Sequence, residues 1–276
     1  MSKVLSAFVI AAAIVTAPPA MADRAEDLRS LGEAIGLPRI IALMREEGLA
    51  YGDDIANDMF GGVPSASWQG TVDEIYDTDA MLEAVEAGLE DGLAETDLDP
   101  LLEFFTSERG QRIIDFEISA RAALMDEDIE AAAEETYLGL RDAGDARLDL
   151  LDRFVEANDL VESNVMGAMN SNYAFYEGLA DSDALPPSMT ENDMLREVWS
   201  QEDLIREDTT LWVFSYLSMA YRPLDDADLE AYIAISETEA GQALNRALFD
   251  GFDDMYVAIS RALGQAAGRL MGGQDI

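Results

Sequence analysis

The chain of 276 residues carries 57 acidic and 17 basic side chains, a formal net charge of −40, and contains neither histidine nor cysteine. This charge excludes nucleic acid and anionic lipid surfaces as expected partners, because both are bound through clustered Lys and Arg. The two missing residue types exclude disulfides, thiol nucleophiles, imidazole bases and the usual zinc sites. The sequence also lacks a nucleophile elbow, a phosphate-binding glycine loop and a dinucleotide motif, so most common enzyme plans are excluded.

The first residues are typical of a secretory signal peptide. Lys3 precedes an apolar run over residues 4–17 that is too short to span a bilayer, and Ala20-Met21-Ala22 supplies the small residues of a cleavage site before Asp23. We therefore predict a signal peptide over residues 1–22 and a periplasmic or secreted mature protein without an integral membrane segment. The alternative is an uncleaved membrane anchor.

Apolar residues at helical spacing follow this segment and predict a series of amphipathic helices. The first covers residues 23–36, and the second begins at Pro38, a favourable first-turn residue, and ends at Gly61. A further helical segment runs from Trp68 to a turn at Asp91-Gly92. The first part of the chain is thus expected to be helical throughout.

The next stretch, Asp97–Ile114, recurs later in the chain as Asp228–Asn245. Each copy contains a short apolar helix, a Ser or Thr that can cap the next helix, an acidic residue favoured by the helix dipole, and a Gly-Gln pair that opens a long amphipathic helix. We predict that the first of these long helices continues to Leu140. The equivalent positions are Trp68 and Trp199, Ser107 and Thr238, Gly110 and Gly241, and Gln111 and Gln242.

This duplication predicts two homologous helical repeats, over residues 23–144 and 145–276, packed on each other as an α-helical bundle. No segment alternates apolar and polar residues long enough to indicate a strand. Leu211–Leu217 is an apolar run that could form one, but its counterpart Leu82–Leu89 has helical spacing, so we predict a buried helix. The predicted fold class is all-α.

Phe104–Ile114, with the sequence FFTSERGQRII, resembles the motif of the domain-of-unknown-function 2059 family. In that motif a helix ends in an aromatic residue and is followed by a Ser/Thr helix start with Gly-Gln. The second copy has Ile235-Ser236 where the aromatic pair would stand. The resemblance implies a small helical domain of exported proteobacterial proteins, present here as two diverged copies, and it implies no catalytic residue.

The candidate sites each have a structural interpretation and a functional alternative. Glycine early in a helix allows close approach of the preceding helix, so we predict packing for Gly110 and Gly241, with a ligand pocket between the repeats as the alternative. We predict that both tryptophans are core anchors and that Gly264 and Gly268 mark close helix contacts. The acidic clusters are expected to be solvated helix faces, with calcium binding as the alternative; they are Asp126–Glu130, Asp225–Glu230 and Asp250–Asp254.

The predicted function is that of a non-enzymatic interaction or envelope-accessory module that uses grooves between helices to bind a basic protein or peptide. We predict no catalytic residue and no cofactor. The first alternative is a divalent-cation protein that binds calcium. The second is an enzyme of unrecognised type that uses carboxylates whose pKa values are shifted by burial.

Overall fold

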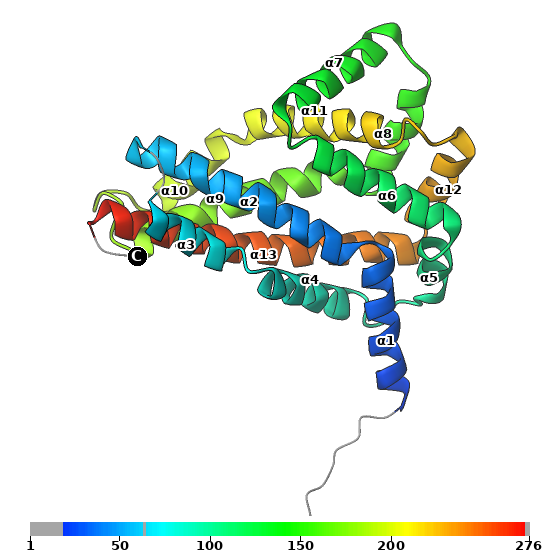
Figure 1. The fold of residues 1–276 in the computed structure, drawn as a ribbon, viewed down its shortest axis with the longest axis horizontal. Helices are drawn as coiled ribbons and strands as arrows, with labels where there is room; N and C mark the ends of the chain where they lie inside the picture. The colour runs from blue at the N-terminus through cyan, green and yellow to red at the C-terminus, as the bar shows by residue number, and fades with distance from the viewer. Residues whose placement is uncertain (1–18, 63–64, 274–276) are drawn as a thin grey trace, which may run out of the picture.

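The computed structural model describes residues 19–62 and 65–273, and every regular element within these ranges is an α-helix (Figure 1). The all-α prediction is therefore confirmed. The helices, in chain order, are α1 (Pro19–Ala34), α2 (Leu37–Phe60), α3 (Ala66–Ile75), α4 (Thr78–Gly92), α5 (Asp99–Phe105), α6 (Glu108–Ala123), α7 (Glu127–Ala143), α8 (Arg147–Ala157), α9 (Leu160–Asp181), α10 (Glu191–Ser200), α11 (Glu202–Ala220), α12 (Asp226–Ser236) and α13 (Glu239–Met271).

Local side-chain chemistry sets more than half of the helix starts in the described chain. Side chains that accept a hydrogen bond from the first turn precede seven helices, which satisfies amide groups that have no partner inside the helix. Gly36 and Gly61 lie at helix ends with φ angles of 73° and 65°, a backbone conformation that glycine adopts without steric cost. The capping residues are Ser65, Asp77, Ser107, Asp126, Thr190, Asp225 and Thr238.

The predicted long helix from the first motif to Leu140 is interrupted, so that prediction is wrong. The α6 helix ends at Ala123, and Asp126 starts α7 by accepting hydrogen bonds from the amides of Asp128, at 3.0 Å, and Ile129, at 3.3 Å. The corresponding helix of the second half, α13, continues without a break to Met271. The two halves therefore differ after their shared motif.

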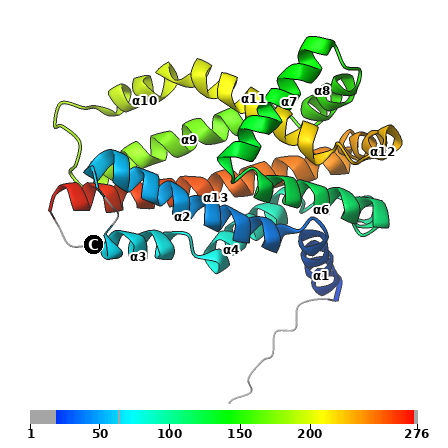
Figure 2. The ribbon, with the colours of Figure 1, turned by 45° about the horizontal axis from the view of Figure 1, so that its top comes forward.

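The long helix α13 lies at the centre of the bundle, with α9 and α2 beside it in Figure 2. Glycines bring its backbone close to both α4 and α9. A Cβ added at Gly88 of α4 would lie 2.6 Å from Cα of Gly251, and one added at Gly264 would lie 2.2 Å from the carbonyl oxygen of Phe175 in α9. A Cβ at Gly268 would lie 1.9 Å from Oγ of Ser182. The prediction that Gly264 and Gly268 mark close helix contacts is confirmed.

Two large hydrophobic clusters form most of the core of the described chain, and each draws on both halves of the sequence; a third, small cluster joins α9 to α10. One joins buried residues of α1–α5, such as Leu31 and Leu101, mainly to α13, represented by Leu263. The other joins α6 and α7 to α8, α11 and α12, and includes Ile113 and Leu217. The chain boundary near Gly144 therefore does not separate two independent cores. Val213, Phe214 and Leu217 are buried in α11, which confirms the buried-helix prediction for Leu211–Leu217.

The signal-peptide prediction falls mainly on residues 1–18, which lie outside the described residues. The predicted cleavage residues Ala20, Ala22 and Asp23 belong to the start of α1, and cleavage there stays a prediction. None of the helices in the described ranges combines the length and the apolar character that a bilayer crossing needs.

Candidate functional site

The two helix starts predicted from the repeated motif have the same local geometry. Ser107 Oγ accepts a hydrogen bond from the amide of Gly110 at 3.1 Å, and Thr238 Oγ1 accepts one from the amide of Gly241 at 3.0 Å. A Cβ at Gly110 would lie 2.2 Å from the Phe104 carbonyl oxygen, and one at Gly241 would lie 2.0 Å from that of Ile235. Both glycines are buried against the preceding helix, which is the close approach that the packing interpretation predicts.

The two glutamines of the motif have different surroundings. Gln111 Nε2 donates to the carbonyl oxygens of Ala34 at 2.7 Å and Phe105 at 2.6 Å, and so ties the start of α6 to the end of α1. Gln242 is exposed on α13. The polar part of the motif therefore anchors a neighbouring helix in the first copy.

The tryptophan prediction holds for the first residue only. Trp68 is fully buried, and its indole Nε1 donates to the carbonyl oxygen of Gly52 at 2.8 Å. Trp199 is 57% exposed at the end of α10, so the prediction of a core anchor is wrong there. The α3 helix packs closely on α2 at Gly52, where a Cβ would lie 2.5 Å from the Val72 side chain. The α10 helix contacts α9 and α11 at the edge of the bundle.

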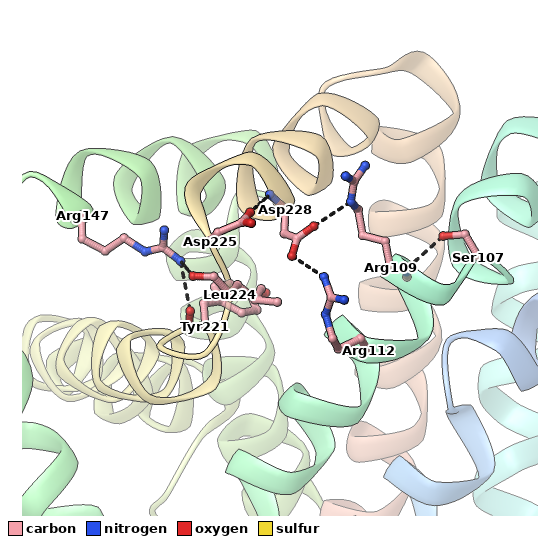
Figure 3. A network of polar contacts seen from close by, with 9 residues as sticks. Ser107, Arg109, Arg112, Arg147, Tyr221, Leu224, Asp225 and Asp228 are labelled. Atoms are coloured by element: carbon pink, nitrogen blue, oxygen red, sulfur yellow. Dashed lines mark hydrogen bonds and ion pairs between the residues drawn. The ribbon is translucent and has the colours of Figure 1, made fainter.

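A polar network joins the first motif to the α12 helix of the second half (Figure 3). Asp228 is 7% exposed and accepts hydrogen bonds from Arg109 Nε, at 2.8 Å, and from Arg112 Nη2. The hydrogen bond from Arg109, aided by Arg112, holds the pKa of Asp228 below its ordinary value. Asp225 Oδ1 accepts from the amide of Asp228 at 2.8 Å. This network is a structural link between the halves, because both arginines belong to α6 and Asp228 belongs to α12.

A large hollow in the described surface is a groove between α2 and α9 with α13 as its floor, hereafter the α2–α9 groove. Its larger part has a volume of about 720 Å³ and its smaller part about 230 Å³. The two parts share Met44 of α2, Ala168 and Ser171 of α9, and Tyr256 of α13, so they adjoin each other. The α11 helix contributes Trp212 to the wall of the larger part.

Large apolar and aromatic side chains dominate the walls of this groove. The rings of Trp212 and Tyr216 stack with centroids 5.2 Å apart and an angle of 10° between their planes. Met166 and Tyr51 line the groove and are 47% and 52% exposed, respectively. Exposed apolar surface of this kind is typical of a site for another molecule, and methionine adapts its shape to different partners.

The charged side chains of the groove leave an excess of acid. Arg121 is neutralised by a bidentate ion pair in which Glu47 accepts from Nε at 2.8 Å and Nη2 at 2.7 Å. Asp253 accepts from Asn170 Nδ2 at 3.1 and 3.0 Å. Burial raises the pKa of Asp253 against this hydrogen bond, and repulsion from nearby carboxylates including Asp250 adds to the effect. The groove is therefore apolar with a negative rim.

The acidic clusters considered for calcium do not converge on a common point. Within residues 19–62 and 65–273, no group of three or more acidic side chains is placed to hold a metal ion. Asp126 and Asp225 cap helices, and Asp228 is paired with two arginines. The calcium alternative consequently finds no support in the described part of the chain.

Sequence reasoning missed the residues that form the groove. Arg121 and Glu47 lie 74 positions apart, and Asn170 and Asp253 lie 83 apart, so no local spacing relates them. Composition gave a signal for two of the groove residues. Trp212 and Tyr216 belong to the apolar run Leu211–Leu217, which we predicted to be a buried helix.

The fold and the groove together define an all-α protein with a central long helix and no recognised catalytic constellation among the described residues. Residues 79–136, which run from α4 into α7, match the family model of an uncharacterized protein conserved in bacteria, DUF2059. The resemblance of the first motif is thereby confirmed, while the family match does not extend to the second motif. No curated protein and no solved structure matches the chain.

Proposed function

We propose that this protein is a non-enzymatic interaction module and that its α2–α9 groove binds a cationic amphipathic segment of a partner protein. The observation that carries this proposal is an apolar, aromatic groove with a negative rim, in which the lining arginine, Arg121, is already paired with Glu47. A helix that lies in a groove contributes apolar residues spaced three and four apart, which suits a long depression of this kind.

Charge complementarity favours a basic partner. The chain has a formal net charge of −40, so its field attracts cationic segments and accelerates their encounter with the groove. Apolar contact with residues such as Met166 and Trp212 then supplies most of the affinity, because exposed charges at a rim contribute little to it. Binding should consequently weaken with salt but remain dependent on the apolar face of the ligand.

We further infer that the protein acts outside the cytoplasm, after cleavage following Ala22, and that its halves are homologous repeats. The apolar run and small residues before Asp23 support export. The matching helix starts at Ser107 and Thr238 support duplication. Electrophoretic comparison of full-length protein with protein recovered from the periplasm, followed by N-terminal sequencing, tests the export proposal. Recovery of an uncleaved chain in the cytoplasm would contradict it.

A designed peptide of leucine and lysine with an amphipathic helical pattern tests the groove directly. We expect the purified protein to bind it, and we expect Met166→Lys to weaken binding by about tenfold, because the new charge repels the peptide from the apolar wall. Fluorescence anisotropy of a labelled peptide measures the affinity.

Two controls separate groove binding from general attraction between opposite charges. Leu204→Lys makes a comparable charge change at a side chain that is 61% exposed and outside the groove, so its affinity should stay close to that of the native protein. A peptide of the same composition without an amphipathic face should bind weakly. Equal effects of the two substitutions, or equal binding of the two peptides, would refute the proposed role of the groove.

A further inference from the structure

A second cavity lies where the α5–α6 and α12–α13 helix pairs meet. It has a volume of about 130 Å³, and its wall is predominantly apolar, with aromatic side chains from three helices. Phe105 comes from α5, Tyr232 from α12 and Phe252 from α13. Gly241 of the second motif also lines it, which places a residue of the repeated motif at a cavity between the halves. A cavity of this size accommodates a small organic molecule or group.

One carboxyl group, that of Glu117 on α6, lines this cavity. Its Oε1 accepts a hydrogen bond from the hydroxyl of Tyr221 at 2.5 Å, and Tyr232 provides a second side-chain hydrogen bond. Burial raises the pKa of Glu117 to about 7, against the opposing effect of these two hydrogen bonds. This partly buried acid is thus held by hydroxyl groups that carry no charge.

The groups around Glu117 provide no positive charge to balance its ionised form. Burial raises the pKa of each neighbouring phenol, Tyr216, Tyr221 and Tyr232, so these side chains stay neutral. The nearby Arg121 is paired with Glu47, and none of the cavity-lining residues in the described structure is an arginine or a lysine. A carboxylate that is partly shielded from water and has no counter-ion is unfavourable, and a ligand that brings a positive charge reduces that cost.

We propose that this cavity binds a small organic cation of the alkylammonium class, with its charge held by Glu117 and its apolar groups against the aromatic wall. Aromatic ring faces attract cations, and quaternary ammonium groups bind preferentially in such surroundings. A metal ion fits poorly, because calcium and magnesium need several oxygen ligands and the cavity offers one carboxyl group. An anion is opposed both by Glu117 and by the net charge of the chain.

Choline and its uncharged carbon isostere, 3,3-dimethylbutan-1-ol, are the probes that test this site. We expect choline to bind at pH 8 and the isostere to bind at least about tenfold more weakly, because the two share shape but differ in charge. We also expect choline binding to weaken by about tenfold or more at pH 5.5, where Glu117 is protonated. Isothermal titration calorimetry on protein expressed from the full sequence measures both effects.

The decisive variant is Glu117→Gln, which keeps the shape of the side chain and removes its charge. We expect it to abolish choline binding, while Glu103→Gln, the same change at an exposed position on α5, should leave binding unchanged. Circular dichroism establishes that both variants retain their helices. Equal affinity for the charged probe and its isostere, or native binding by Glu117→Gln, would overturn the proposal. Failure of this test leaves the α2–α9 groove unaffected, since Glu117 does not line it.

Discussion

Glu117 combines partial burial, side-chain hydrogen bonds and the absence of a counter-ion. Its pKa of about 7 exceeds the ordinary value of 4.5, so the folded protein binds a proton there that the unfolded chain has already released. Folding stability therefore falls as pH rises from about 4.5 to about 7, and this contribution is constant above that range. The same group thus links stability to pH near neutrality, although the chain has no histidine.

The stability prediction at residue scale concerns Glu117→Gln. Since glutamine has no charge to bury, the variant should gain up to about 3 kcal/mol relative to the native protein on going from pH 4.5 to pH 8. Urea unfolding of both proteins at several pH values measures the difference in their free energies of unfolding. The other carboxylates are the same in both proteins, so their effect cancels in this difference. A free-energy difference that does not change with pH would show that Glu117 ionises normally in the folded protein.

At the scale of elements, two helical glycines show that the neighbouring backbone decides the effect of an added methyl group. Gly178 of α9 faces α13, where an added Cβ would lie 2.1 Å from the carbonyl oxygen of Arg261. Gly139 of α7 is also helical, yet nothing lies within 4 Å of its added Cβ. The same residue type therefore has opposite energetic effects in two helices, depending on the neighbouring backbone.

We predict opposite signs for alanine substitutions at these two glycines. Gly178→Ala should lower the free energy of unfolding by about 1–3 kcal/mol, because α9 and α13 must move apart. Gly139→Ala should raise it by about 0.5–1 kcal/mol, because alanine restricts the unfolded chain and favours a helix. Chemical denaturation monitored by circular dichroism measures both values, and a stabilised Gly178→Ala protein would contradict the contact between the two helices.

At the scale of the molecule, the long helices after the repeated motif pack in clusters shared between the halves. The α13 helix completes the cluster of α1–α5, and α6 and α7 complete that of α8, α11 and α12. The Asp228 network adds a polar link between the same halves. Neither half retains its full core without the other, so we expect cooperative folding of the whole chain.

A protein with Trp68 as its single tryptophan tests this cooperativity. Trp199→Phe and Trp212→Phe together leave an indole that is buried in the cluster of α1–α5 and α13. Its fluorescence and the far-ultraviolet circular dichroism of all helices should give the same unfolding midpoint. Two separate midpoints would indicate that the cores unfold independently.

Native Trp199 is exposed, so its replacement alone should have little effect on stability.

Much of the fold was predictable from short-range patterns. Apolar spacing identified the helices, Ser107 and Thr238 identified two helix starts, and Gly36 and Gly61 identified two ends. The break before α7 was also encoded locally, since Asp126 is a capping residue, but the continuous apolar spacing around it led to the wrong prediction. The exposure of Trp199 had no local signal.

The sequence alone determined the helical fold class, the acidic character, the helix caps and the recurrence of the Gly-Gln motif. These properties depend on composition or on residues within one or two helical turns, where backbone geometry fixes the spacing. Only the tertiary structure decided which helices share a core, that α2 and α9 leave a groove above α13, and that Glu117 meets Tyr221 and Tyr232. Such contacts join residues far apart in the chain, and they depend on how complete helices pack rather than on local periodicity.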